Sequence, residues 1–259
     1  SGLPTIVIEE VNTKKILVTG ASGKLGRAII SSGLFKSVIS PDSGTMNLTD
    51  LKSINKIVDT NNISHVIHCA AIARMSICEA DPIKAIKVNI IGTSNLVQAI
   101  IKKEKVTKKE IRFIYISTDG VYESKNGFYS ENGPTVPYNK YGWSKLGAEC
   151  VVRMLKNHLI LRTRFFDSKD IPYGNSANDI FTSSLEIKEL VLAIYRLTFI
   201  HLKGVINIGG ERKSDYDRYK KFKTDLKICK RDDITKNLSY KIAKDASMDV
   251  SKWKDIKDK

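Results

Sequence analysis

The sequence predicts an α/β fold in which a doubly wound, mostly parallel sheet is followed by a small C-terminal lobe. Two observations lead to this prediction. Short apolar runs with strand character alternate with segments of helical periodicity, which is typical of a parallel sheet covered by helices on both faces. A glycine-rich turn also joins the first of these runs to the first helical segment. In such a sheet the ligand binds at the carboxyl ends of the strands.

The expected elements follow one another along the chain. We expect strands over residues 15–19, 38–39, 64–69, 111–116, 159–163 and 204–208. We expect helices over residues 27–31, 54–60, 82–103, 138–156 and 185–197. Residues 167–182 are rich in Pro, Gly, Asn and Ser and predict a loop, while the Lys-rich chain after residue 215 is expected to be partly helical. The pattern predicts a core over residues 14–166 and a short lobe over residues 167–259 that is interleaved with the sheet.

The composition narrows the classes of protein. A hydrophobic fraction of 42% is ordinary for a globular chain, and no apolar run approaches the ~20 residues of a membrane span. No leader sequence is visible, so we expect a cytoplasmic protein without membrane contact. The four cysteines form no Cys-x-x-Cys pair, and we expect reduced thiols and no metal site. The formal charge of +15 reflects either anionic partners or a Lys-rich composition throughout, and without a matching motif we expect no nucleic-acid partner.

A Gly-x-x-Gly-x-x-Gly turn follows the first expected strand and opens the first expected helix. Gly20 permits the tight turn, Gly23 lets the backbone approach a pyrophosphate, and Gly26 lets the helix pack close to the sheet. The helix N-terminus then presents free N–H groups to the phosphates. The turn therefore predicts a dinucleotide site.

The choice of dinucleotide depends on fewer residues. Asp42 lies near the place where an NAD-binding carboxylate is expected, but it follows Pro41 and is equally explained as a loop residue. Lys24 and Arg27 are suited to a 2′-phosphate, although both are also explained as solvated helix charges. We expect NADP(H), with NAD(H) left open.

A tyrosine and a lysine four residues apart form the candidate catalytic pair. On a helix Tyr141 and Lys145 share one face, and the nearby ammonium is expected to lower the pKa of the phenol. The phenol can then protonate a carbonyl oxygen as hydride arrives at carbon, while Lys145 holds the nicotinamide ribose. Thr118 directly follows an expected strand, so its hydroxyl lies at the ligand edge of the sheet and can stabilise the oxyanion.

These motifs together resemble the extended short-chain dehydrogenase/reductases, and among them the dTDP-4-dehydrorhamnose reductase family. The resembling segments are residues 16–26, 47–50, 65–71, 88–96, 117–122 and 137–145. The similarity is good from about residue 14 to residue 166 and thin beyond it. It implies a Rossmann-like dinucleotide-binding core with the catalytic helix over residues 14–166 and an abbreviated substrate-binding lobe over residues 167–259.

The resemblance assigns roles residue by residue. The catalytic positions are Thr118, Tyr141 and Lys145. The implied cofactor-binding residues are Gly20, Ser22, Gly23, Lys24, Leu25, Gly26, Asn47, Leu48, Cys69, Ala70, Ala71, Asn89, Tyr141 and Lys145. Asn89 is expected to support the lysine, and Thr118 and Phe165 are expected to contact the substrate. Asn47 replaces the usual Asp, and Met75 with Ser76 replaces a hydrophobic-Asp pair.

The resemblance implies NAD(P)H-dependent reduction of the 4-keto group of a nucleoside-diphosphate-linked 6-deoxysugar. The base, dTDP or UDP, and N-acetylation of the sugar are left open. A nucleotide-sugar epimerase or dehydratase with bound NAD is an alternative, because Asp119 follows Thr118, although Gly120 departs from the dehydratase pattern. A non-catalytic regulatory subunit of the same fold is a second alternative. The expected partner is a nucleotide-sugar substrate, with a homodimer left open.

Overall fold

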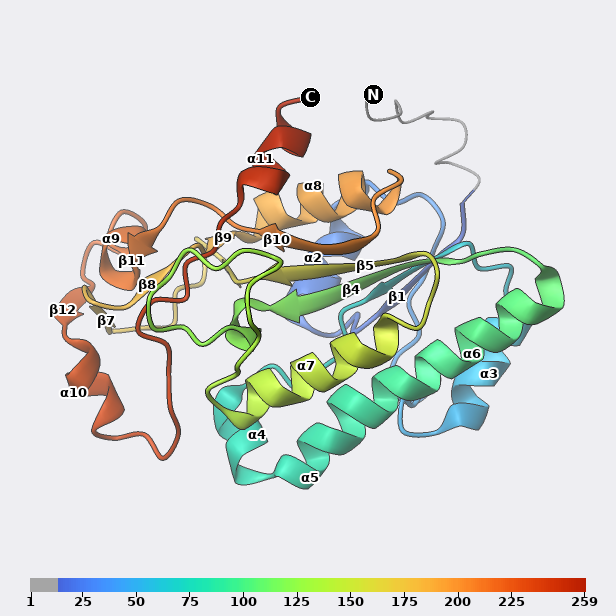
Figure 1. Cartoon of the computed structure of the whole chain (residues 1–259), viewed down its shortest axis with the longest axis horizontal. Coiled ribbons are helices and arrows are strands. Elements are labelled where there is room, and N and C mark those ends of the chain that lie inside the picture. Colours follow the sequence, from blue (N-terminus) through green and yellow to red (C-terminus); the bar gives the residue numbers. More distant parts are fainter. Residues whose placement is uncertain (1–13) are drawn as a thin grey trace.

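A six-stranded parallel sheet forms the centre of the chain, which a computed structural model describes over residues 14–259 (Figure 1). Its strands are β1 (Ile16–Thr19), β2 (Val38–Ile39), β3 (His65–His68), β4 (Arg112–Thr118), β5 (His158–Thr163) and β10 (Gly204–Ile208). They lie in the order β10-β5-β4-β3-β1-β2, and every neighbouring pair is parallel. The predicted doubly wound fold is confirmed.

Side chains of β4 show why this sheet needs helices on both faces. All seven residues of this strand are buried. Ile114 packs into one apolar cluster, whereas Phe113 and Tyr115 on either side of it pack into the other. Successive side chains of the strand point to opposite faces, and both faces are buried. Apolar residues therefore follow one another directly along the strand, as expected for a parallel sheet covered on both sides.

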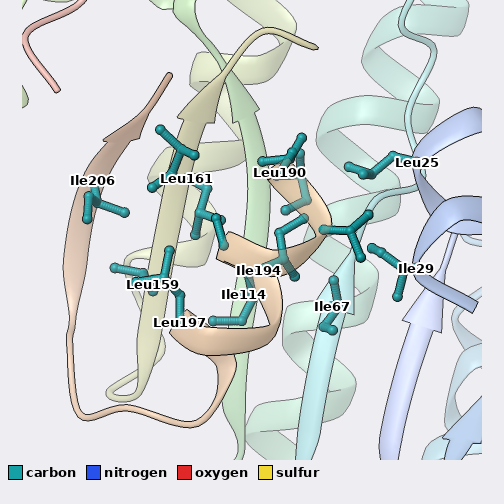
Figure 2. Packing of buried hydrophobic residues seen from close by; sticks show 14 of the residues in the cluster. Leu25, Ile29, Ile67, Ile114, Leu159, Leu161, Leu190, Ile194, Leu197 and Ile206 are labelled. Atoms are coloured by element: carbon teal, nitrogen blue, oxygen red, sulfur yellow. The ribbon is translucent and has the colours of Figure 1, made fainter. Parts of the chain in front are cut away.

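One face is covered by α2 (Lys24–Ser31), α8 (Ile187–Thr198) and α11 (Ser251–Lys257). Figure 2 shows side chains of α2 and α8 meeting the sheet residues in this cluster. The other face is covered by α3 (Leu51–Thr60), α6 (Gly92–Thr107) and α7 (Lys140–Val152). No helix within residues 14–259 has the combined length and apolar character that crossing a membrane requires.

The helix expected over residues 82–103 is interrupted. After α4 (Met75–Ala80), α5 (Pro82–Ala85) passes into a π-helical turn over Ile86–Ile91 and then into α6. Asp81 caps α5 by accepting a 2.9 Å hydrogen bond from the Lys84 amide. Apolar spacing does not distinguish a π turn from an α turn over so short a stretch, so the interruption has no signal in the sequence pattern.

The lobe after β5 is held together by pairs of short strands. These are β6 (Phe165–Phe166) with β9 (Leu185–Glu186), β7 (Asn175–Ala177) with β12 (Lys227–Cys229), and β8 (Phe181–Thr182) with β11 (Lys213–Ser214). The remaining helices are α9 (Asp215–Tyr219) and α10 (Arg231–Thr235). The loop expected over residues 167–182 therefore contains two strands, which pair with residues too far along the chain for local composition to reveal. A functional division at residue 166 stays a prediction.

A buried ion pair fixes α7 to the sheet. Glu149 of α7 receives hydrogen bonds of 3.0 and 2.7 Å from the guanidinium of Arg162 on β5. It also accepts a 2.6 Å hydrogen bond from the hydroxyl of Ser117 on β4. Both charged side chains are at most 2% exposed. Helix α7 carries Tyr141 and Lys145, and β4 ends at Thr118. The contacts of Glu149 therefore fix the position of the Tyr-Lys pair relative to Thr118.

Candidate active site

The glycine turn forms a tight cradle beside the end of β3. Gly20 has a φ of 74°, and a Cβ there would lie 2.7 Å from the Ala70 amide nitrogen. A Cβ at Gly26 would overlap the Gly20 carbonyl oxygen. Gly23 is the N-cap residue of α2 and has no side chain that could bond to the first N–H groups of the helix. The first turn of this helix also holds no acidic residue. The N-terminal N–H groups of α2 are therefore free to bind an anion such as a pyrophosphate.

One cavity of about 320 Å³ joins this turn to the carboxyl ends of β3, β4 and β5. Its lining includes most of the predicted site residues: Gly20, Gly23, Lys24, Leu25, Gly26, Cys69, Ala71, Thr118, Tyr141, Lys145 and Phe165. It also includes residues that the sequence did not assign: Ala73, Met75, Ile116, Ser117, Thr163 and Arg164. Chain segments more than 100 residues apart thus meet where the fold class expects a ligand.

Tyr141 lies near the start of α7 with its phenol at this cavity. Burial raises the pKa of Tyr141 to about 12, and a hydrogen bond with Thr118 opposes the rise. The expectation that Lys145 lowers the phenol pKa is therefore wrong for this structure, because removal from water favours the neutral phenol more strongly. The phenol is therefore protonated at neutral pH and is a weaker acid than a tyrosine in water.

Lys145 is buried one helical turn after Tyr141. Its ammonium donates a 2.7 Å hydrogen bond to the Ile116 carbonyl oxygen and lies 4.5 Å from the centre of the Tyr115 ring. Burial lowers the pKa of Lys145 to about 8. The Tyr115 ring and one backbone carbonyl hold the ammonium in place and leave it further donors for a ligand.

Thr118 is the last residue of β4. Its hydroxyl oxygen accepts a 3.0 Å hydrogen bond from the Gly120 amide, which fixes the side chain at the strand end. At the end of the next strand the Thr163 hydroxyl is buried and finds no partner within residues 14–259. Both threonines are among the residues that line the cavity.

An ion pair between Arg164 and Asp119 was missed by the sequence analysis. The two side chains form a bidentate contact of 2.7 and 2.8 Å, and Asp119 is fully buried. Its only signal was the short Arg-Thr-Arg sequence at the end of β5, because residues two apart along a strand lie on the same side of it. Both carboxylate oxygens of Asp119 are thus occupied by Arg164.

Five predicted cofactor residues do not line the cavity: Ser22, Asn47, Leu48, Ala70 and Asn89. The side-chain oxygen of Asn47 accepts hydrogen bonds from the amide and the hydroxyl of Thr49. The Leu48 carbonyl accepts a 2.8 Å hydrogen bond from the side chain of Asn95. These contacts stabilise the loop before α3. The roles of these two residues at the adenine stay predictions.

Asn89 lies in the π turn and acts on the site indirectly. Its amide accepts a 2.8 Å hydrogen bond from the Ile72 backbone N–H and donates a 2.9 Å hydrogen bond to the Ser144 hydroxyl. Asn89 thus bonds to Ser144, the residue before Lys145, and its expected support of the lysine stays a prediction. The π turn links the loop after β3 to the catalytic helix α7.

Comparisons with known proteins agree with this arrangement. The family model described as the RmlD substrate binding domain matches residues 14–186. A dTDP-4-keto-6-deoxy-D-glucose reductase of Streptomyces niveus is 29% identical over 69% of this chain and 59% of its own. Methionine adenosyltransferase 2 subunit beta of Rattus norvegicus is 31% identical over 61% of this chain and 48% of its own. The chain thus spans about half the length of the curated relatives it matches.

Solved structures show the same fold. A dTDP-4-dehydrorhamnose reductase of Bacillus anthracis in complex with NADP superimposes with a TM-score of 0.83 at 20% identity, covering 93% of this chain and 92% of that one. A hypothetical dTDP-4-dehydrorhamnose reductase of Sulfolobus tokodaii gives 0.81 at 26% identity, covering 93% and 94%. Since the family model matches most of the chain, the resemblance found in the sequence is confirmed, and the chain belongs to the RmlD substrate binding domain family.

Proposed function

We propose that the protein reduces the 4-keto group of a nucleoside-diphosphate-linked 6-deoxysugar with a nicotinamide dinucleotide. The observation that carries the proposal is the single cavity shared by the glycine turn, Thr118, Tyr141 and Lys145. The relatives named as reductases of nucleotide-linked keto sugars support the same class of reaction. The base and the sugar stay open, as they were in the sequence.

The residues present fit a dinucleotide. The glycine cradle has no room for a Cβ at Gly20 or Gly26, and the uncapped N-terminus of α2 offers N–H donors to phosphates. When bound, the nicotinamide supplies the hydride. Lys145 would hold its ribose hydroxyls, with Cys69 and Ala71 at the end of β3 beneath it.

The chain's own residues handle the proton and the developing charge. Tyr141 donates its phenolic proton to the keto oxygen as hydride arrives at the keto carbon. Thr118 donates its hydroxyl hydrogen to the same oxygen as negative charge builds there. Phe165 lines the cavity on the side of the lobe and would contact the sugar.

We infer NADP(H) as the preferred dinucleotide, with NAD(H) retained. Asp42 accepts a 2.8 Å hydrogen bond from the Thr45 amide, so its carboxylate is used within its own turn. Lys24 stands at the pyrophosphate turn, where a cation suits an extra phosphate. A structural neighbour of the reductase type was solved with NADP, and a UDP-glucose 4-epimerase neighbour with NAD. The cytoplasmic location and the homodimer considered from the sequence stay predictions.

The dehydratase alternative is disfavoured by the Arg164–Asp119 ion pair. Dehydration requires an acid that can deliver a proton next to the strand-end threonine. In Asp119 both carboxylate oxygens are bound by the Arg164 guanidinium, and the side chain is fully buried.

Turnover of a panel of nucleotide-linked 4-keto-6-deoxysugars tests the proposal, with NADPH or NADH oxidation followed by absorbance. We expect Tyr141→Phe to lower kcat by about 10²–10⁴-fold while the affinity for NADPH is retained. Tyr216→Phe, outside the cavity on α9, is the matched control and keeps full turnover. Equal turnover by the wild type and Tyr141→Phe would refute the assigned chemistry.

A non-catalytic regulatory subunit is the second candidate. Its specific support is the 31% identity to methionine adenosyltransferase 2 subunit beta over 61% of this chain. If this candidate is right, no sugar of the panel is reduced, and Tyr141→Phe leaves binding to the regulated enzyme intact. Turnover by the wild type that is lost in Tyr141→Phe decides for the reductase.

A further inference from the structure

A second cavity of about 770 Å³ lies on the face of the sheet covered by α8 and α11. It is bounded by these two helices, by α9 and by the turn after β10. None of its lining residues belongs to the catalytic cavity. Its volume is within the range of small-molecule sites, so its chemistry indicates what it can hold.

Arg218 gives this cavity a buried charge without a matching carboxylate. The side chain is 6% exposed, and its guanidinium donates to the carbonyl oxygens of Ser184, Thr182 and Glu211. Asp215 and Glu211 act on the charge from nearby, but within residues 14–259 no carboxylate forms an ion pair with it. A buried cation that is bound only by carbonyls is poorly compensated and favours an anionic ligand beside it.

Two polar atoms at the same wall also lack partners. The hydroxyl of Ser184, a residue only 1% exposed, and the Nε of Arg218 make no hydrogen bond within the described chain. Buried polar side chains nearly always have partners, so two such groups on neighbouring residues of one cavity are an uncommon coincidence.

The charges around the cavity are mainly positive. Its cationic side chains are Arg196, Lys213, Arg218, Lys221, Lys254 and Lys257. Its carboxylates are Glu186, Glu189 and Glu211, of which Glu211 pairs with Lys213 at 3.1 Å and Glu186 accepts hydrogen bonds from Lys188 and Ser168. Two of the three carboxylates thus already bind other groups. Lys254 and Lys257 of α11 and Lys221 just after α9 are then available to bind an anion.

Aromatic side chains form part of the same lining. Phe166, Phe222 and Trp253 contribute rings, and Phe222 is 47% exposed. Rings beside cations suit a ligand that carries both phosphate and a planar base, because the base stacks while the phosphates meet the charges.

We propose that this cavity is a second nucleotide site, which binds a nucleoside polyphosphate with its phosphates toward Arg218, Lys254 and Lys257. The base packs against Phe222, the most exposed ring of the lining, beside the mostly buried Trp253. The site is separate from the catalytic cavity, and the proposal does not rest on the reductase activity.

Tryptophan fluorescence provides a local readout. The chain has two tryptophans, Trp143 on α7 and Trp253 in the cavity. Trp143 is 54% exposed, so Trp143→Phe leaves the fold intact and Trp253 as the reporter. We expect titration with ADP to change Trp253 emission in a saturable manner. Pyrophosphate binds more weakly than ADP, and adenosine causes no saturable change at the same concentrations.

Charge reversal assigns the change to this cavity. In the Trp143→Phe background, Lys254→Glu with Lys257→Glu weakens ADP binding by about tenfold or more, because two cations beside the phosphates become anions. Lys102→Glu with Lys105→Glu makes the same charge change at the same spacing on α6, and ADP binding stays at its original affinity. Unfolding midpoints verify that both variants are folded, and their NADPH affinities remain equal.

Three results would overturn the proposal: no saturable change with ADP, equal weakening in the two double variants, or pyrophosphate binding as tightly as ADP. Failure of sugar turnover would leave this experiment unaffected, so the two proposals fail separately.

Discussion

Removing the charge of Glu149 tests how α7 is held against the sheet. In Glu149→Gln the side chain keeps its shape, but Arg162 stays buried without a counterion. The pair is at most 2% exposed on both sides, so water does not replace the lost carboxylate. Loss of one partner of such a pair costs about 3–5 kcal/mol.

The loss is measurable by urea unfolding followed by circular dichroism. With a slope of about 2–3 kcal/mol per molar urea, the midpoint falls by about 1–2.5 M. The slope itself should stay constant, which shows that the change lies in stability and not in the extent of unfolding. Replacement of both partners, Glu149→Met with Arg162→Met, recovers part of the loss because no uncompensated charge remains.

The matched control is an exposed pair. Lys236 and Asp233 lie 3.5 Å apart at α10 with more than half of each side chain exposed, so Asp233→Asn leaves the midpoint unchanged. If Glu149→Gln shifted the midpoint no more than this control, burial of the pair could not be what holds α7. A double replacement less stable than Glu149→Gln would contradict the same reasoning.

Three further predictions concern the site. Gly26→Ala should weaken NADPH binding by about tenfold or more and lower Tm, because the new Cβ overlaps the backbone of the glycine turn. The control is Gly174→Ala, whose Cβ meets nothing within 4 Å. Equal NADPH affinity and Tm in the two variants would contradict the tight cradle. Asp170→Asn should tighten NADPH binding by about twofold to fivefold at low salt, since it releases Lys24 from a 2.8 Å ion pair; an unchanged dissociation constant excludes this competition. Because Lys145 is cationic below its pKa of about 8 and neutral above it, kcat/KM should fall as pH rises through that value, and a flat profile there argues against an ammonium role.

The sequence was most informative where one local requirement decides the structure. The glycine spacing predicted the cradle because only a missing side chain permits the approach of Gly20 to Ala70 and of Gly26 to the turn. The strand over residues 204–208 was predicted with its observed limits, since an apolar run this short, with glycines at both ends, favours a buried strand over a helix.

Features that depend on distant partners were not predictable. The pairing of β7 with β12 joins Asn175–Ala177 to residues about 50 positions later, and neither segment has a pattern of its own. The partner of Asn89 depends on the π turn, which apolar periodicity does not reveal. The pKa of Tyr141 depends on burial by the whole cavity, whereas spacing on a helix showed only its lysine neighbour.

The structure also divides the formal charge of +15 into two kinds of cation. Lys102 and Lys105 on α6 project into solvent, which agrees with a Lys-rich surface. Lys24 at the glycine turn and Lys254 on α11 instead line cavities, where low-dielectric walls strengthen their attraction for anions. Composition alone therefore could not choose between anionic partners and a general excess of lysine, because lysines of both kinds occur in the chain. Binding at either cavity should weaken with rising salt, and charge reversal on α6 should leave that salt dependence unchanged.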